Sequence, residues 1–148
     1  MTISVRPISN TDYAIWCDLY SAYAEFYQVA QTKEMRDEVW SWLQNENHEV
    51  KGFIALSDEG LAVGIAHYRP FSRPLSASIG GFLDDLFVAP NYRGSEISKR
   101  LIEAVVKVGK ENNWSVIRWI TAESNYRARG CYDKLAMQTK WFTYDIKL

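Results

Sequence analysis

The sequence of 148 residues predicts a mixed α/β layer fold, and three observations lead to that prediction. Apolar residues recur at three- and four-residue spacing in four segments, which is typical of amphipathic helices. Apolar runs of strand length, some interleaved with polar residues, occupy six other segments. The two kinds of segment follow each other in the order β-α-α-β-β-β-α-β-α-β, which favours helices packed on a sheet.

The N-terminal half begins with a strand in which Ile3, Val5 and Ile8 are interleaved with polar residues. The capping residues Ser9–Asp12 mark the start of a helix, and Ser57–Gly60 forms a turn between two apolar runs, which predicts a hairpin. The elements expected here are a strand over 3–8, helices over 13–27 and 32–44, and strands over 51–56 and 61–68.

The C-terminal half contains a long apolar stretch that Asp84 and Asp85 interrupt and that Ala89–Tyr92 ends. A helix then carries Lys99 and Glu103 on a solvated face. The elements expected here are a loop around Pro70 and Pro74, a strand over 78–88, a helix over 94–112, a strand over 116–122, a helix over 125–136 and a strand over 139–147.

Composition and charge exclude several classes of protein. The chain has no repeat or linker, so we expect one domain over residues 1–148. Its 17 basic and 18 acidic residues give a net charge of −1, which argues against nucleic acid as the main partner. No apolar run predicts a membrane span, and the N-terminus lacks a signal-peptide pattern. Two cysteines are too few for a disulfide framework or a zinc site, so we expect a reduced cytoplasmic protein without a metal.

The segment from Leu83 to Ser98 is the most informative, because a buried strand runs through a turn directly into a helix. The first turn of a helix has unpaired N–H groups and a partial positive charge, which together bind phosphate. Arg93 lies at the edge of this turn, and Gly94 permits close approach of a ligand to the backbone. By itself the pattern fits a plain strand-to-helix turn equally well.

Four motifs together resemble the GNAT-family N-acetyltransferases, most closely the polyamine and histone acetyltransferase-like branch. They are Leu-Asp-Asp-Leu-Phe-Val from Leu83, Arg-Gly-x-x-Ile-x-x-x-Leu-Ile from Arg93, Trp119-Ile120-Thr121, and Asn125-x-x-Ala128-x-x-x-Tyr132-Asp133-Lys134. The resemblance implies the GNAT acyl-CoA N-acyltransferase fold, with a central mixed, mostly antiparallel sheet flanked by helices. It also implies acetyl-CoA as cosubstrate and an amine as acceptor.

The resemblance also implies roles for individual positions. It places the pyrophosphate of the cosubstrate on the backbone amides of Arg93, Gly94, Ser95, Glu96, Ile97 and Ser98, and the pantetheine arm beside Leu86, Phe87 and Val88. The amide of Phe87 or Val88 would polarise the thioester carbonyl. Asn125 would hydrogen-bond the pantetheine or the bound cofactor. The amine would attack the thioester directly in a ternary complex, and Tyr132 would protonate the departing thiolate.

Glu96 departs from the family pattern, which has glycine at that position. Its carboxylate adds bulk and a negative charge near the pyrophosphate, at a cost of under about 1 kcal/mol if it points to solvent and a few kcal/mol if it points into the loop. The alternative to an enzyme is therefore a degenerate GNAT domain that binds acyl-CoA or a protein partner without catalysis.

Two candidates for acid–base chemistry have structural alternatives. Tyr132 lies two helical turns after Asn125 and can line the same cleft, but it also shares a stripe with core positions. In the related branch the position of Asp84 holds a proposed base, so Asp84 is the candidate here; a carboxylate that caps backbone N–H groups beside a bulge is equally consistent. Asp84 and Asp85 point to opposite faces unless the strand bulges.

The acceptor remains open among polyamines, lysine side chains, aminoglycosides and small amino compounds. In the family the first two helices line the acceptor site, where aromatic rings and carboxylates suit a cationic amine or simply pack and solvate the domain. His67 either faces this site or is structural. The aromatic residues Trp141, Phe142 and Tyr144 suit an interface, so we expect a homodimer.

Overall fold

A five-stranded sheet with helices on both faces forms the protein, and the computed structural model describes residues 2–94 and 96–148. The strands are β1 (Ile3–Pro7), β2 (Lys51–Ser57), β3 (Ala62–Arg73), β4 (Ser78–Val88) and β5 (Ile117–Arg118), and the helices are α1 (Tyr13–Phe26), α2 (Lys33–Gln44), α3 (Ile97–Glu111) and α4 (Tyr126–Leu135). The strand order is β1-β2-β3-β4-β5; only β4 and β5 are parallel. The predicted mixed α/β layer fold is confirmed.

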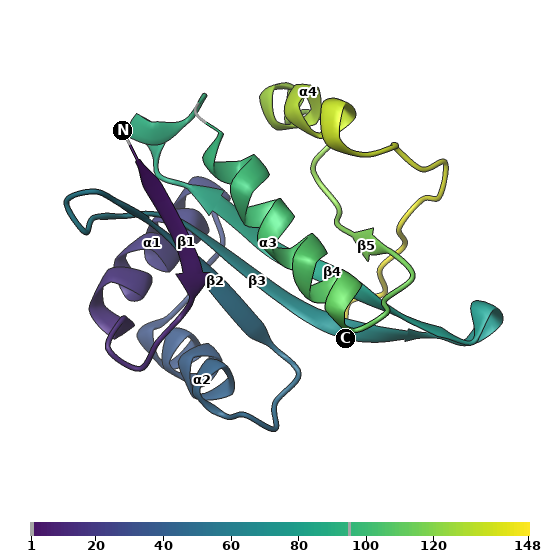
Figure 1. Cartoon of the computed structure of the whole chain (residues 1–148), viewed down its shortest axis with the longest axis horizontal. Coiled ribbons are helices and arrows are strands. Elements are labelled where there is room, and N and C mark those ends of the chain that lie inside the picture. Colours follow the sequence, from purple (N-terminus) through teal and green to yellow (C-terminus); the bar gives the residue numbers. More distant parts are fainter. Residues whose placement is uncertain (1, 95) are drawn as a thin grey trace.

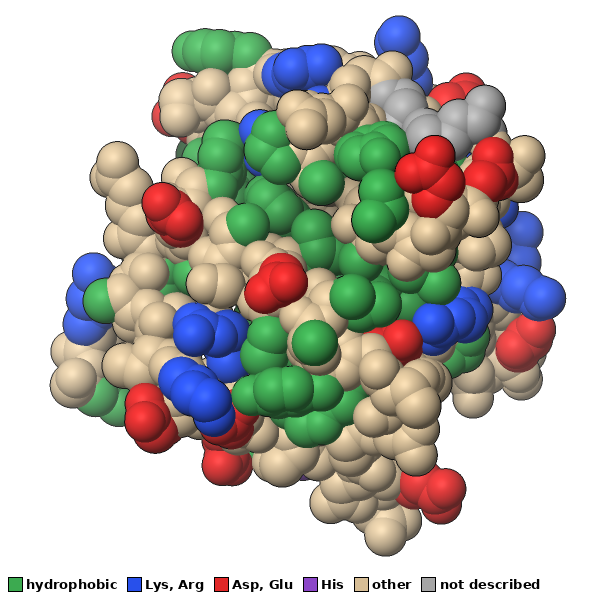
Figure 2. Space-filling model, turned by 90° about the vertical axis from the view of Figure 1, so that its left-hand side faces the viewer, with side chains coloured by type: hydrophobic (Ala, Val, Ile, Leu, Met, Phe, Trp, Pro, Cys, Tyr) green, Lys and Arg blue, Asp and Glu red, His purple; other side chains and the backbone are tan. Residues whose placement is uncertain are grey.

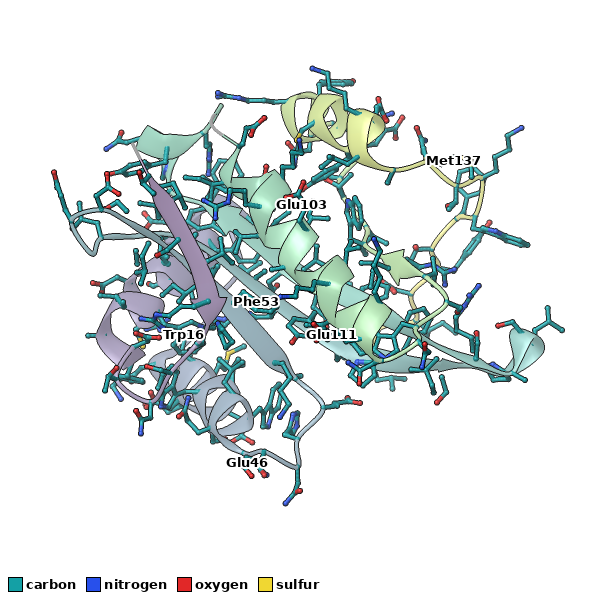
Figure 3. The ribbon with its side chains drawn as sticks, viewed as in Figure 1. Trp16, Glu46, Phe53, Glu103, Glu111 and Met137 are labelled. Atoms are coloured by element: carbon teal, nitrogen blue, oxygen red, sulfur yellow. The ribbon has the colours of Figure 1, made fainter. Side chains whose placement is uncertain are left out.

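Helix α3 covers one face of the sheet and α1 and α2 cover the other (Figure 1), and each face carries its own hydrophobic core. Leu101 and Val105 of α3 are fully buried against one face, where Phe53 of β2 also packs (Figure 3). Trp16 of α1 is fully buried against the other face, beside Ile65. Among the described residues, no helix is long and apolar enough to cross a membrane.

The expected loop around Pro70 is wrong, because β3 continues through this residue to Arg73. Pro70 pairs with Gly81 of β4, and the amide of Gly81 donates away from β3, to Val116 O at 2.8 Å. Pro70 and Gly81 therefore form a pair that exchanges no main-chain hydrogen bonds, because their N–H and C=O groups point away from each other. Because β2 pairs with β3 only as far as Tyr68, the missing N–H of Pro70 faces an open edge and costs no hydrogen bond.

The C-terminal third differs most from the sequence prediction. The strand expected over 116–122 is only two residues long, and the strand expected over 139–147 is absent, since these residues form no regular structure. Phe142, Tyr144 and Ile146 alternate with polar residues as in a strand, but a strand also needs a partner edge, which this part of the described chain lacks. The helix expected from residue 94 begins at Ile97.

Candidate active site

A cleft of about 780 Å³ opens where β4 and β5 separate. The two strands pair only at Gly81 with Ile117 and at Phe82 with Arg118, so the edge of β4 beyond Phe82 has no strand beside it on this side within the described chain. The start of α3, the end of α1 and most of α4 complete the walls. The predicted site residues that line the cleft are Leu86, Phe87, Val88, Arg93, Gly94, Glu96, Ser98, Asn125 and Tyr132.

The remaining predicted site residues lie elsewhere. Ile97 is buried and does not line the cleft. Ser95 lies outside the described residues. Asp84 is not part of the cleft wall.

The exposed edge of β4 presents the amides of Leu86 and Val88 to the cleft. The amide of Ala89 donates to Val63 O at 2.9 Å, so Ala89 faces β3. Main-chain groups alternate in direction along an antiparallel strand, and those of Phe87 therefore also face β3, opposite Ile65. Of the two donors that the sequence left open for a thioester carbonyl, Val88 is the one with the required direction.

The loop before α3 forms the cationic end of the cleft. Gly94 has φ +84°, a backbone conformation that residues with a Cβ rarely adopt. A Cβ at this position would lie 3.1 Å from the guanidinium of Arg127. The first intrahelical bond of α3 runs from Arg100 N to Glu96 O, which leaves the N–H groups of Ile97 and Ser98 without intrahelical acceptors.

Two cations at this end were missed from the sequence. Arg127 and Lys134 line the cleft together with Lys99. Arg127 and Lys134 lie seven residues apart on α4, the same two-turn spacing as Asn125 and Tyr132. This spacing could have identified them from the sequence as residues on the same face of the helix. Arg100, the residue after Lys99, instead donates to the main-chain oxygen of Ile3.

The side chain of Arg93 turns back from the loop onto β4. Its Nε donates to Val88 O at 3.2 Å, and its guanidinium lies 4.3 Å from the ring centre of Phe26. Val88 O faces the cleft edge, as its amide does, so Arg93 fixes the last residue of the strand. This side chain therefore shapes the cleft and leaves the backbone of the loop to meet phosphates.

Tyr132 and Asn125 both reach the cleft from α4. Burial raises the pKa of Tyr132 to about 12, so its hydroxyl is protonated at neutral pH. The ring packs edge-on against Trp119 at 5.3 Å, and its hydroxyl has no hydrogen-bond partner among residues 2–94 and 96–148. Asn125 Nδ2 donates to the hydroxyl oxygen (Oη) of Tyr27 at 3.4 Å and to Thr121 Oγ1 at 3.3 Å, which joins α4 to the end of α1.

A β-bulge separates the environments of the two aspartates. His67 pairs with Asp85 and Tyr68 pairs with Leu83, so Asp84 is the extra residue. Asp84 accepts two hydrogen bonds from Arg69, at 2.9 and 3.3 Å, while burial raises its pKa. Asp85 accepts from His67 at 2.8 Å and from Tyr20 at 3.1 Å on the α1 side of the sheet. The two carboxylates therefore have different partners.

Comparison with known proteins identifies the family. The model of the acetyltransferase (GNAT) family matches residues 16–137. The chain belongs to the GNAT family. Its similarity to GNAT proteins extends over nearly the whole chain: it is 26% identical over 143 residues to the D-amino-acid N-acetyltransferase HPA3 of Saccharomyces cerevisiae, covering 96% of this chain and 89% of the yeast protein.

Solved structures share the fold of this GNAT domain. The ribosomal-protein-alanine N-acetyltransferase of Brucella melitensis biovar Abortus superposes with a TM-score of 0.80 at 20% identity, covering 99% of this chain and 100% of that one. The structure of AAC(6')-Iy in complex with a bisubstrate analogue, CoA-S-monomethyl-acetylneamine, gives a TM-score of 0.83 at 20% identity over 100% of this chain and 99% of that one. The expected GNAT fold is thus confirmed.

Proposed function

We propose that the protein transfers an acetyl group from acetyl-CoA to a primary amine by direct attack in a ternary complex. One observation carries this proposal: a single cleft joins outward-facing strand amides, a phenol and the N-terminus of α3. Family membership supports acetyl transfer, and the named relatives are N-acetyltransferases.

The chemistry of the cleft walls fits acetyl-CoA. The backbone around Gly94 and the start of α3 would hold the pyrophosphate, with Lys99, Arg127 and Lys134 neutralising the phosphates. The apolar edge at Leu86 and Val88 would receive the pantetheine arm, and a volume of about 780 Å³ is in the range of sites for ligands of this size.

Three groups of the chain would act on the reacting atoms. The N–H of Val88 donates to the thioester oxygen, on which negative charge develops during attack. Tyr132 gives its proton to the sulfur as the C–S bond breaks. Asn125, held between Tyr27 and Thr121, positions the arm beside them. The protein thereby aligns donor and acceptor and stabilises the charge that moves between them.

A thiol-release assay tests the proposal. Acetyl-CoA is incubated with the protein and a panel of amines. A D-amino acid, an aminoglycoside and an alanine peptide follow the relatives, and spermidine represents the polyamines. We expect amine-dependent release of free CoA with at least one of them. Calorimetry with acetyl-CoA separates the alternative, a degenerate domain that binds acyl-CoA or a protein partner without catalysis. Binding without release by any amine favours that alternative, and no binding at millimolar acetyl-CoA leaves only its second form, a domain that binds a protein partner.

We also propose that the protein is a homodimer in which the C-terminal segment 139–148 of each copy packs on its partner. Trp141, Phe142 and Tyr144 are 87%, 86% and 90% exposed in the single chain. Aromatic side chains bury about 150–250 Å² each, so six of them in a dimer account for roughly 900–1,500 Å², near the size of a stable interface.

A further inference from the structure

The end of α1 reaches both walls of the cleft. Phe26 is the last residue of the helix, Tyr27 follows it, and both line the cleft. Figure 2 views the molecule from the side of α1, and hydrophobic side chains gather in the middle of this face with acidic and basic side chains around them. Phe26 and Tyr27 are 53% and 42% exposed. Side chains so exposed contribute little to either core, so their contacts within the cleft are the ones to examine.

Phe26 meets the guanidinium of Arg93 on the β4 side of the cleft. The guanidinium lies 4.3 Å from the ring centre of Phe26 and 5.5 Å from that of Phe87. It forms no ion pair with a carboxylate among the described residues, and its Nε donates to Val88 O at 3.2 Å. Aromatic faces attract a cation through their negative potential. Phe26 therefore keeps the side chain of Arg93 against β4.

Arg93 in turn restrains Val88, the residue whose N–H would polarise the thioester carbonyl. Val88 is the last residue of β4, and the amide of Ala89 closes the ladder to β3 with a bond to Val63 O at 2.9 Å. Ends of strands open more readily than their centres, because fewer contacts hold them. The bond from Arg93 to Val88 O therefore determines how firmly the N–H of Val88 is aimed into the cleft.

Tyr27 meets Asn125 on the α4 side of the cleft. The amide nitrogen of Asn125 donates to Tyr27 Oη at 3.4 Å and to Thr121 Oγ1 at 3.3 Å. An amide NH₂ group has two hydrogens, so these two bonds use both. Oδ1 of Asn125 accepts no hydrogen bond among the described residues. Tyr27 thus orients the amide so that its carbonyl oxygen is left for the pantetheine arm, which offers amide N–H groups.

We propose that Phe26 and Tyr27 are positioning residues for acetyl transfer: Phe26 keeps Arg93 on Val88, and Tyr27 presents the carbonyl oxygen of Asn125 to the pantetheine amides. The inference rests on the proposed function and gives the two residues separate effects. Phe26 acts on the chemical step, because the direction of the Val88 amide matters most when charge develops on the thioester oxygen. Tyr27 acts on the binding of acetyl-CoA.

Kinetics with the best amine of the panel test the role of Phe26. Phe26→Leu removes the ring and should lower kcat about tenfold, with the acetyl-CoA dissociation constant within about threefold of wild type and the midpoint of urea unfolding unchanged. Phe26→Tyr keeps the ring face and should keep kcat within about twofold. Tyr126→Leu removes a ring that faces Arg129 outside the cleft, and should change nothing. Full kcat in Phe26→Leu, or an equal loss in Phe26→Tyr, overturns this role.

Calorimetry with acetyl-CoA tests the role of Tyr27. Tyr27→Phe removes only the hydroxyl and should raise the dissociation constant about three- to tenfold, the range of one hydrogen bond, while kcat at saturating acetyl-CoA stays within about twofold of wild type. Tyr126→Phe, the same change on α4 outside the cleft, should leave both values unchanged. An unchanged affinity in Tyr27→Phe, or a loss of kcat as large as that in Phe26→Leu, overturns this role.

Hydrogen exchange separates a failure of this inference from a failure of the proposed function, because it needs no turnover. The amide of Ala89 reports on the end of β4, and it should exchange about tenfold or more faster in Phe26→Leu than in wild type. In Tyr126→Leu its exchange should match wild type. Faster exchange in Phe26→Leu supports the link from Phe26 to Val88 even if no amine is acetylated. Unchanged exchange overturns that link even if the enzyme is active.

Discussion

At the scale of single residues, Tyr132 carries the proposed proton transfer. At its ordinary pKa, a tyrosine gives a proton to a thiolate uphill by about 1.5 units; at about 12 the gap is about 3.5 units, or roughly 5 kcal/mol. This cost is compatible with turnover only if the proton moves as the sulfur leaves. We expect Tyr132→Phe to lower kcat about 100-fold, since general acids contribute about 10²–10⁴, with acetyl-CoA affinity nearly unchanged in calorimetry.

The pH profile gives a second readout of Tyr132. The neutral form of Tyr132 is the one that donates the proton, and burial raises its pKa to about 12. Deprotonation of Tyr132 should therefore not lower wild-type kcat at any pH below about 10. Tyr126→Phe, an exposed tyrosine on the same helix, is the control and should keep full turnover. A Tyr132→Phe enzyme as fast as wild type would remove Tyr132 from its role.

Glu96 is the residue that sets this chain apart from the family pattern. Its side chain is exposed at the N-terminus of α3, within the cleft wall, and caps no backbone N–H. Solvent screening keeps its repulsion of a pyrophosphate at about 1 kcal/mol or less. Glu96→Gly should therefore tighten acetyl-CoA binding up to about fivefold in calorimetry.

The control for Glu96 is the same loss of charge at the far end of the helix. Glu111→Gln should leave acetyl-CoA affinity unchanged, because Glu111 is the last residue of α3 (Figure 3). Affinity that stays constant or falls in Glu96→Gly would contradict the electrostatic interpretation.

At the scale of elements, the seat of α3 on the sheet depends on Gly64. A Cβ there would lie 3.0 Å from side-chain atoms of Ile97 and Leu101 and 3.1 Å from Phe87 O, three groups at the base of the cleft. Gly64→Ala should lower the free energy of unfolding by about 1–3 kcal/mol through overpacking. Urea-induced unfolding measures it.

The same Gly→Ala substitution at Gly130 should have the opposite effect on the free energy of unfolding. A Cβ at this position of α4 meets no atom within 4 Å, so Gly130→Ala should stabilise by up to about 1 kcal/mol through helix propensity alone. Destabilisation by both substitutions to the same extent would show that close approach of α3 is not the cause.

The junction of β1 and α1 is held by a charge pair whose effect depends on pH. Arg6 donates to both oxygens of Asp12, at 2.7 and 2.9 Å, and Ser9 N donates at 2.7 Å. The hydrogen bond from Arg6 holds the pKa of Asp12 below its usual value, against the effect of burial. The stabilisation is therefore complete above about pH 4 and is lost as pH falls through the lower, folded-state pKa.

Asp12→Asn should accordingly cost about 2 kcal/mol in free energy of unfolding at pH 7. The difference from wild type should shrink steadily between about pH 4 and pH 2 in urea titrations. A difference that is the same at pH 7 and pH 2.5 would show that the charge of Asp12 is not what stabilises the junction.

Elements with strong periodicity were predictable from the sequence, and those set by long-range pairing were not. The stripe through Leu101 and Val105 and the turn at Ser57–Gly60 are local signals, and the structure confirms the helix and the hairpin. Pro70 was misjudged because its tolerance depends on where the pairing of β2 with β3 stops, at Lys51 and Tyr68, which lie 17 residues apart in the chain. The C-terminal strand was wrong because alternation describes a strand but supplies no edge to pair with.

The candidate site divides in the same way. The loop at Arg93–Gly94 and the pair Asn125 and Tyr132 were found through motifs, and all four line the cleft. The neighbours of Asp84 and Asp85 were not predictable, because a bulge is decided by how two strands register. Side-chain contacts across the sheet, such as that of Trp16 with His67, span 51 residues and leave no local pattern.

At the scale of the whole molecule, the proposed dimer depends on the exposed C-terminal segment 139–148. If two copies cover each other's aromatic residues, the wild type should run in size-exclusion chromatography with light scattering at twice the 17.1 kDa of the chain. Phe142→Glu combined with Tyr144→Glu should give a monomer, because both are exposed aromatic side chains that the proposed interface would bury.

A change of the same net charge at polar positions of that segment is the control. Thr143→Glu together with Lys147→Gln also removes two charge units and should remain dimeric. A wild type that is monomeric at 100 μM would remove the dimer, and a dimer that survives the Phe142 and Tyr144 changes would place its interface elsewhere.

The extra residue of the β4 bulge, Asp84, changes which residues of the strand, odd- or even-numbered, turn their amides away from β3. Ahead of it, odd-numbered Gly81 turns its amide toward β5; after it, even-numbered Leu86 and Val88 do so. Shortening the chain by Asp84 would remove the bulge but leave Asp85 to Val88 opposite the same residues of β3, so the amide of Val88 would still face the cleft. Such a deletion would straighten the strand without turning its open edge around, and would separate the effect of the bend from that of the amide direction.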